Sequence, residues 1–161
     1  MTEPNPPETP PRLDETYALS GDYDVEGTLM VGLPHSADIG MRRHYVGEGQ
    51  AILSVDWEER LVGDPERGVL HGGVITALLD TACGGAVMAV PERLESLATL
   101  DLRIAYMRPA TKGRRIYCRA ECYRLTKSIA FTRAVAFHDD PEDAVASASG
   151  TFIVERKAPK S

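Results

Sequence analysis

The stretch HGGVITALLDTACGGAVMAV, residues 71–90, carries the strongest helical pattern in the chain and decides its fold. Apolar residues recur in pairs every four residues and form one stripe, made of Val74, Ile75, Leu78, Leu79, Ala82, Cys83, Ala86 and Val87. A second face carries small residues and one carboxylate, at Gly73, Ala77, Asp80 and Gly84. Glycine inside a helix costs about 1 kcal/mol relative to alanine, so this face indicates close approach of another backbone or of a ligand. The alternative is a core helix with a few small packing residues.

The chain opens with a proline-rich segment. Residues 1–12, MTEPNPPETPPR, contain five prolines and no apolar residue after the first, a composition that cannot bury a core. We expect residues 1–30 to form a largely disordered tail and residues 31–158 to form a single domain, as the length of 161 residues allows. A short helix is predicted over residues 33–41, with Ser36 as a candidate cap.

The remaining elements show the period-2 alternation of β-strands. Residues 43–57 are predicted to be extended, with a turn or bulge marked by Gly47 and Gly49, and residues 62–70 are predicted to be a loop. Four strands are predicted after the helix, over residues 97–107, 114–125, 128–137 and 144–155. In the first of these strands, Thr99 belongs to the polar face. The apolar face of that strand is made of Ala98, Leu100, Leu102, Ile104 and Tyr106. One helix followed by four strands with short connections predicts an antiparallel meander packed on that helix.

Composition and charge exclude several classes of protein. No run of eighteen apolar residues is present and no basic, apolar signal peptide opens the chain, so we expect a cytoplasmic protein without a membrane span. The net charge of −6 argues against a general nucleic-acid binder. The cysteines form no Cys-x-x-Cys pair, and Cys118 and Cys122 would lie about 13 Å apart on one strand face, too far to bridge. Free thiols are therefore expected, with Cys83 in the core.

Positive charge is concentrated in one part of the chain. From Arg103 to Arg133 there are nine Lys or Arg residues and one acid, Glu121, which gives this segment a charge of +8. A basic segment on an acidic protein suits a small polyanion such as a phosphorylated cofactor. Arg108 and Lys112 flank a predicted turn and are the best candidates for phosphate contacts. The alternative is that these side chains are the solvated faces of strands.

One motif gives the chain a family resemblance. His71-Gly72-Gly73, then Asp80 on an apolar helix, and then the strand TLDLRIAYMRPA at residues 99–110 resemble the PaaI-like (4HBT-type) hotdog-fold thioesterases. The resemblance covers roughly residues 34–154. It implies an α+β fold in which a long central helix is wrapped by an antiparallel sheet of about five to six strands. It also implies hydrolysis of acyl-coenzyme A thioesters without a cofactor.

The resemblance assigns roles to individual residues. Gly72 would supply the backbone N–H that polarises the thioester carbonyl, and Asp80 would be the nucleophile or the general base. Thr99 matches a Ser or Thr that helps to position the attacking water. His71 matches the histidine of the motif, which is a positioning residue, and Gly73 is a candidate substrate contact.

The chain departs from the family pattern just before this motif. Relatives often carry an Asn six residues before the motif histidine, and here that position is Pro65. Asp64, one residue earlier, is the candidate replacement for substrate binding. A carboxylate only accepts hydrogen bonds, whereas an amide also donates them, so the replacement changes what this position can do.

The same chemistry can be argued from the residues themselves. Thioester hydrolysis needs an activated oxygen nucleophile and a donor for the developing oxyanion. A helix start offers unpaired N–H groups, and a glycine there lets a carbonyl come close. Gly72 and Asp80 are about 12 Å apart on one helix, too far for one carbonyl carbon to touch both. A second, antiparallel helix would bring its own Asp80 beside this Gly72, which predicts a homodimer with shared sites, alone or as a dimer of dimers.

Two other functions compete with this hypothesis. A hotdog hydratase or dehydratase needs an Asp and a His five residues apart, whereas Gly85 lies five residues after Asp80. A non-catalytic acyl-CoA binder or sensor on the same fold would not require Asp80. His35, His44 and His138 show no ligand spacing with acids or thiols, so no metal is expected. The acyl group depends on the shape of the pocket and stays open at this point.

Overall fold

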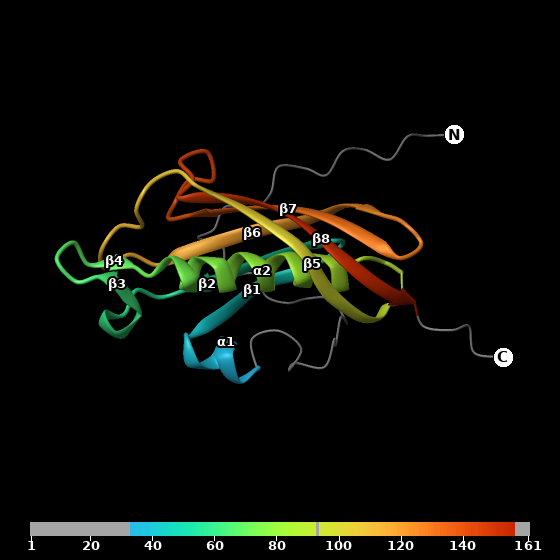
Figure 1. The fold of residues 1–161 in the computed structure, drawn as a ribbon, viewed down its shortest axis with the longest axis horizontal. Helices are drawn as coiled ribbons and strands as arrows, with labels where there is room; N and C mark the ends of the chain where they lie inside the picture. The colour runs from blue at the N-terminus through green and yellow to red at the C-terminus, as the bar shows by residue number, and fades with distance from the viewer. Residues whose placement is uncertain (1–32, 93, 157–161) are drawn as a thin grey trace.

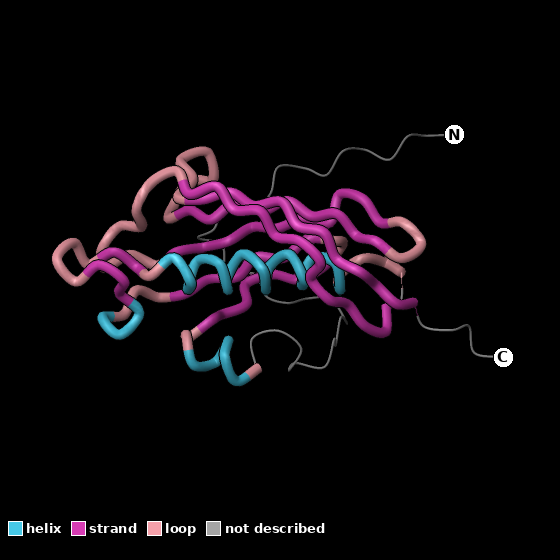
Figure 2. Tube along the Cα trace, in the orientation of Figure 1, coloured by secondary structure: helices cyan, strands magenta, loops and turns pink. Residues whose placement is uncertain are grey.

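The computed structural model describes residues 33–92 and 94–156 of the chain. At its centre lies one long helix, α2 (Gly72–Met88), and a six-stranded antiparallel sheet curves around that helix (Figure 1, Figure 2). The predicted α+β hotdog fold is confirmed, including the expected number of strands. The predicted tail, residues 1–30, and both ends of the predicted 31–158 domain lie outside the described residues.

The strands follow the order β1–β2–β6–β7–β8–β5 across the sheet. Their bounds are β1 (Met41–Gly47), β2 (Gln50–Val55), β5 (Leu94–Tyr106), β6 (Ile116–Leu125), β7 (Ile129–Phe137) and β8 (Ala146–Arg156). The predicted four-strand meander is wrong in one respect, because β5 pairs with β8 at the edge of the sheet and not with β6. Residues 107–115 carry the chain from β5 back to the middle of the sheet. A hairpin turn of two to five residues could not span that distance.

The apolar stripe holds α2 against the middle strands of the sheet, β2, β6 and β7. Every residue of the predicted stripe, from Val74 to Val87, is buried. The helix has His71 as its N-cap and ends at Met88, so the predicted range 71–90 is confirmed to within two residues. Gly73, Ala77 and Asp80, on the small-residue face, are partly or fully exposed. None of the helices in the described part of the chain is long and apolar enough to cross a membrane.

A β-bulge in β5 decides which of its side chains face α2. The register of β5 against β8 shifts between Thr99 and Asp101, which makes Leu100 an extra residue. Thr99 pairs with the buried Phe152, and both Thr99 and Tyr106 reach α2 through their hydroxyl groups. The regular alternation predicted for this strand is therefore broken at Leu100. Leu102, Ile104 and Tyr106 share one face as predicted, but Thr99, which was predicted on the opposite face, lies on that face with them.

The elements before the helix agree with their predictions in part. Helix α1 (Pro34–Asp38) lies within the predicted range, but its first turn begins at the proline, and Ser36 is buried inside the helix instead of capping it. The extended segment 43–57 contains two strands, β1 and β2. They are joined at Glu48 and Gly49, whose φ angles of 50° and 73° form the tight turn that was expected near this point.

The predicted loop at residues 62–70 is a small hairpin. It follows a short 3₁₀ helix, and the elements are η1 (Glu59–Leu61), β3 (Val62–Asp64) and β4 (Val69–Leu70). Asp64 holds the turn, because its Oδ1 accepts the backbone N–H groups of Glu66 and Arg67 at 3.1 and 3.2 Å. Gly68 completes the turn with a φ of 67°. Periodicity could not reveal these strands because each is only two or three residues long.

The three cysteines are free thiols, as predicted. Burial raises the pKa of Cys83 to about 11 and raises the pKa of Cys118 well above its usual range. Both side chains lie in the core between α2 and the sheet. A buried thiol that stays protonated is a poor nucleophile, so Cys83 does not compete with Asp80 for a catalytic role.

Candidate active site

His71 organises the start of α2. Its imidazole Nδ1 accepts the N–H of Gly73 at 2.9 Å, and its carbonyl accepts the N–H of Val74 at 2.9 Å. Nδ1 is therefore the unprotonated nitrogen of the neutral ring, and the ring proton is on Nε2. Among the described residues, none accepts the N–H of Gly72. This N–H is one of the groups that a helix start leaves for a ligand.

An open, mostly apolar cavity of about 400 Å³ lies beside Gly72. Its apolar walls come from β4, the start of α2 and the segment after β5, through Val69, Leu70, Ile75, Met107, Pro109 and Ala110. Three lining residues bring polar groups, namely Gly72, Tyr106 and Arg108. A pocket of this kind suits an apolar chain that ends in a polar group next to Gly72.

Asp80 lies two helical turns further along α2. Its Oδ1 accepts the hydroxyl proton of Thr99 on β5, with 2.9 Å between the two oxygens. Asp80 is partly buried, and its Oδ2 has no partner within residues 33–92 and 94–156. A carboxylate with one oxygen held and the other open is arranged to accept a proton from water.

The structure does not bring Gly72 and Asp80 together within one subunit. The two residues lie eight positions apart on the same helix, which corresponds to about 12 Å along its axis. The carbonyl carbon of one substrate cannot contact both groups.

Tyr106 and Thr76 are candidate site residues that the sequence pattern did not indicate. The Tyr106 hydroxyl lies 2.9 Å from the carbonyl oxygen of Gly72 and 2.8 Å from Thr76 Oγ1. Thr76 Oγ1 lies 3.0 Å from the same carbonyl oxygen. The available signal was position, since Thr76 is one helical turn after Gly72 and Tyr106 ends β5. The bulge that puts Thr99 on the same face as Tyr106 has no such signal.

Two residues predicted to contact the substrate, Asp64 and Gly73, form hydrogen bonds within the fold instead. The carboxylate of Asp64 is bound to its own hairpin turn, and Asp64 does not line the cavity. The N–H of Gly73 donates to His71. A Cβ at Gly73 would lie 2.9 Å from His71 Nδ1, so glycine is needed here for the cap.

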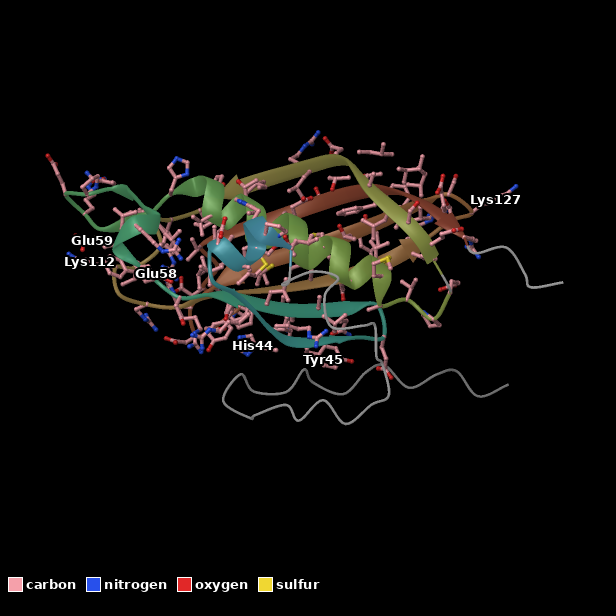
Figure 3. The ribbon with its side chains drawn as sticks, turned by 90° about the horizontal axis from the view of Figure 1, so that it is seen from below. His44, Tyr45, Glu58, Glu59, Lys112 and Lys127 are labelled. Carbon is pink, nitrogen blue, oxygen red and sulfur yellow. The ribbon has the colours of Figure 1, made fainter. Side chains whose placement is uncertain are left out.

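The two basic candidates also have partners. Arg108 donates from Nε and Nη2 to the two carboxylate oxygens of Asp143, at 3.0 and 2.8 Å. Lys112 lies with its ammonium 6.0 Å from the centre of the Trp57 ring, and its stem packs on Gly68. Figure 3 shows Lys112 at the same end of the molecule as Glu58 and Glu59. Other basic residues of the segment are paired with acids, as Arg114 with Asp139, Arg115 with Asp56 and Arg133 with Glu121.

Comparison with known sequences matches this chain to thioesterases. A family model described as the Thioesterase superfamily, 4HBT, matches residues 67–145. The chain is also 29% identical over 135 residues to the medium/long-chain acyl-CoA thioesterase YigI of Escherichia coli. That similarity covers 76% of this chain and 86% of YigI.

Comparison with solved structures agrees on the fold. A crystal structure of a protein from Pseudomonas aeruginosa has a TM-score of 0.68 and 40% identity, and the match covers 76% of this chain and 90% of the other. A mutant of the phenylacetic acid degradation protein PaaI from Thermus thermophilus has a TM-score of 0.65 at 24% identity, covering 74% and 97% of the two chains. The PaaI protein of Escherichia coli has a TM-score of 0.66 at 18% identity, covering 78% and 86%. The two PaaI structures support the hotdog architecture alone.

Proposed function

This chain belongs to the thioesterase superfamily, and we propose that it hydrolyses an acyl-coenzyme A thioester. In this proposal Asp80 is the general base or the nucleophile, and the Gly72 N–H donates a hydrogen bond to the carbonyl oxygen of the thioester. One observation carries these roles. The carboxylate of Asp80 lies on the small-residue face of the apolar helix α2, and the hydroxyl of Thr99 on β5 donates to it at 2.9 Å. Packing of that helix does not require a carboxylate. Hydrolysis of a thioester does require a group of this kind.

The reaction can run in two ways. With Asp80 as general base, a water oxygen attacks the carbonyl carbon while the proton of that water passes to Asp80. The carbonyl oxygen gains negative charge and accepts a hydrogen bond from the Gly72 N–H. The carbonyl then re-forms, the C–S bond breaks, and the leaving thiolate takes the proton from Asp80. With Asp80 as nucleophile, its oxygen displaces the thiolate first, and water then hydrolyses the mixed anhydride. Either course consumes one water and yields one acid and one thiol.

Thr99 and His71 act through other groups in this proposal. Thr99 fixes one oxygen of Asp80, so the other oxygen is left to face the water or the carbonyl carbon. In this way Thr99 would help to position the attacking water through Asp80. His71 fixes the first turn of α2 through Gly73 and so determines where the Gly72 N–H lies.

We further propose that each complete site is shared between two subunits. Strand β5 forms an edge of the sheet and is thirteen residues long, and large apolar side chains are exposed on or beside it, with Leu100 56% and Met107 57% exposed. A long edge strand of this kind is open to pairing with another strand. Two copies of β5 that pair antiparallel about a two-fold axis would continue the sheet and place the two α2 helices side by side.

The contacts of β5 suggest the register of that pairing. Tyr106 lies at Gly72 and Thr99 lies at Asp80, so the two ends of β5 mark the two halves of the site. Because Leu100 is an extra residue in each copy of β5, a two-fold axis at Arg103 would place Thr99 opposite the partner subunit's Tyr106. Asp80 of one subunit would then approach Gly72 of the other, as the chemistry requires.

The cavity suggests which acyl group is taken. Its walls are aliphatic and it begins at Gly72, where the carbonyl oxygen would lie. Apolar walls favour an alkyl chain over a charged or strongly polar acyl group. YigI, a relative of this chain, is named as a medium/long-chain enzyme. We therefore propose medium-chain fatty acyl groups as the preferred substrates.

The phosphates of coenzyme A need cationic partners outside this cavity. We propose Arg108 and Lys112, which lie in the segment after β5 next to the site. Arg108 would have to exchange Asp143 for a phosphate, whereas Lys112 needs only to leave the face of Trp57. Lys112 is for this reason the stronger candidate. Loss of its charge should raise KM for acyl-CoA and leave kcat unchanged, and KM measured for Lys112→Ala at two ionic strengths checks this.

The test of the proposed function is release of free thiol from a panel of acyl-CoA esters of increasing chain length, with an aromatic ester included. We expect turnover by the wild-type protein and a loss of about 100-fold or more in kcat for Asp80→Asn. Asp38→Asn is the matched control, because Asp38 is an exposed carboxylate on α1, outside β5, α2 and the lining of the cavity. It should keep wild-type turnover.

The same panel distinguishes the competing function. A non-catalytic binder would bind acyl-CoA esters without releasing thiol from any of them. Wild-type turnover that is equal in Asp80→Asn would instead mean that another group activates the water. Either result would overturn the roles proposed for Asp80 and Gly72.

A further inference from the structure

Three polar groups meet at the start of α2, beside the cavity. The carbonyl oxygen of Gly72, Thr76 Oγ1 and the Tyr106 hydroxyl lie 2.8 to 3.0 Å from one another. Tyr106 comes from the end of β5 and is 51% exposed, and it lines the cavity together with Gly72. Thr76 is not among the residues that line the cavity.

The cluster contains one hydrogen-bond donor more than the Gly72 carbonyl oxygen can accept. A carbonyl oxygen has two lone pairs. In an α-helix one of them accepts the N–H four residues later, which here belongs to Thr76. One lone pair of Gly72 is left for two hydroxyl protons. When Thr76 donates to it, the proton of Tyr106 is left for another acceptor, which is Thr76 Oγ1 at 2.8 Å or an oxygen of a bound ligand.

Tyr106 lies where a thioester carbonyl oxygen would need a second donor. Its hydroxyl oxygen is 3.4 Å from the position that a Cβ on Gly72 would take. Gly72 and Tyr106 both line the cavity, so a ligand in the cavity can contact both residues. A carbonyl oxygen bound there has the Tyr106 hydroxyl as a second candidate donor beside the Gly72 N–H.

We infer that Tyr106 is a catalytic residue whose hydroxyl donates a second hydrogen bond to the thioester carbonyl oxygen, beside the Gly72 N–H. Thr76 is the positioning residue of Tyr106. When Tyr106 donates its proton to the substrate, the Thr76 hydroxyl donates to the Gly72 carbonyl in its place. The number of hydrogen bonds is the same before and after this exchange. No proton is transferred, so the step needs no further reactant. The inference rests on the proposed acyl-CoA hydrolysis.

The first experiment compares kcat for the wild-type protein, Tyr106→Phe and Tyr123→Phe. The first variant removes the hydroxyl and keeps the ring, so thermal unfolding should stay close to that of the wild type. Removal of one oxyanion donor lowers kcat by about 100-fold, and KM should change much less. Tyr123→Phe is the matched control, since Tyr123 is an exposed tyrosine on β6 that does not line the cavity. It should be unchanged.

The second experiment measures the carbonyl directly. Octanoyl-coenzyme A with a ¹³C-labelled carbonyl is bound to Asp80→Asn, which prevents turnover, and its C=O stretch is read by infrared difference spectroscopy. Each hydrogen bond to the oxygen lowers this frequency. Adding Tyr106→Phe should therefore raise the C=O frequency. If Tyr106 only supported the fold, the same substitution would leave that frequency unchanged.

Thr76 provides a conservative pair of variants. Thr76→Val should lower kcat by about tenfold, because Tyr106 must then choose between the Gly72 carbonyl and the substrate. Thr76→Ser keeps the hydroxyl and should restore wild-type kcat.

The possible results separate the inference from the proposed function. An unchanged carbonyl frequency in the Tyr106→Phe protein overturns the role of Tyr106, even if kcat falls. A kcat within twofold of the wild type overturns it as well. If the wild-type protein releases no thiol from any ester, the proposed hydrolysis fails, and the carbonyl frequency of the bound ester alone decides whether Tyr106 donates to it.

Discussion

At Gly72 the needs of the helix and of the reaction differ. As a helical residue it could be replaced, because a Cβ at this position would meet the Tyr106 hydroxyl oxygen at 3.4 Å, an ordinary contact. Alanine is also a better helix former than glycine by up to about 1 kcal/mol. In the proposed site, however, a methyl group 3.4 Å from the Tyr106 hydroxyl would crowd the space that the substrate oxygen has to occupy.

We therefore predict that Gly72→Ala is folded and inactive. Its melting temperature should equal or exceed that of the wild type, and kcat/KM for the best acyl-CoA ester should fall by about 100-fold or more. Calorimetry and the thiol-release assay measure the two quantities on the same sample. An alanine variant with wild-type turnover would show that no carbonyl binds at this N–H.

Residues of the site could be predicted from the sequence only where a local motif marks them. His71, Gly72 and Asp80 lie within ten positions on one helix, and their spacing alone sets their geometry. Tyr106 depends on how β5 packs against α2, which is a contact between segments 34 residues apart in sequence. The ion pair of Arg108 with Asp143 is likewise a product of tertiary packing. Charge counted along the chain could not show that this arginine already has a partner.

At the scale of elements, β1, β2 and β6 share a polar cluster. Asp56 accepts from Arg115 at 2.5 Å and forms an ion pair with Arg42 at 2.8 Å. His44 on β1 lies in this cluster, with its Nε2 2.7 Å from Ser54 Oγ. Figure 3 shows His44 on the side of β1 away from α2. Burial, together with the charges of Arg115 and Arg42, lowers the pKa of His44 below 6.5.

This cluster predicts how stability depends on pH. Below about pH 6.5 the unfolded chain binds a proton at His44 that the folded chain resists, so the free energy of unfolding should fall as the pH is lowered. Asp56 does not interfere, since its pKa is lowered from 3.8 by its hydrogen bond with Arg115, and the stability it contributes is lost only in stronger acid. Urea unfolding from about pH 7 to about pH 5 should therefore show a steeper loss for the wild type than for His44→Gln. Equal slopes would contradict the assignment.

The elements themselves were predictable to different degrees. Helix α2 and strands β6 to β8 carry long periodic patterns, so their positions follow from local sequence. The pairing of β5 with β8 does not, because it depends on where residues 107–115 carry the chain. The hairpin of β3 and β4 is stabilised by side chains such as Trp57, which donates to the Gly68 carbonyl at 2.8 Å, and not by any repeating pattern.

At the scale of the whole molecule, the proposed sharing of sites can be tested by mixing two inactive proteins. Asp80→Asn keeps a working Gly72, and Gly72→Ala keeps a working Asp80. If the two are unfolded and refolded together, half of the dimers are hybrids, and each hybrid has one intact site. Recovered activity should thus be about a quarter of the wild-type value.

Each variant refolded alone is the control and should stay inactive. Light scattering on the same samples should give the mass of at least a dimer. An active monomer, or a mixed dimer with no recovered activity, would mean that one subunit holds the whole site.

The bulge at Leu100 decides whether an odd or an even number of regular positions separates Thr99 from Tyr106. Thr99 and Tyr106 are seven residues apart, an odd number, so an unbroken strand would direct them to opposite faces. The one extra residue between them changes odd to even, and both hydroxyls then reach the same helix. Deleting Leu100 would remove the bulge and leave an even separation of six, whereas inserting a single regular residue between them would restore the odd count. One of the two, either the partner of Asp80 or the partner of Gly72, would then turn away from α2.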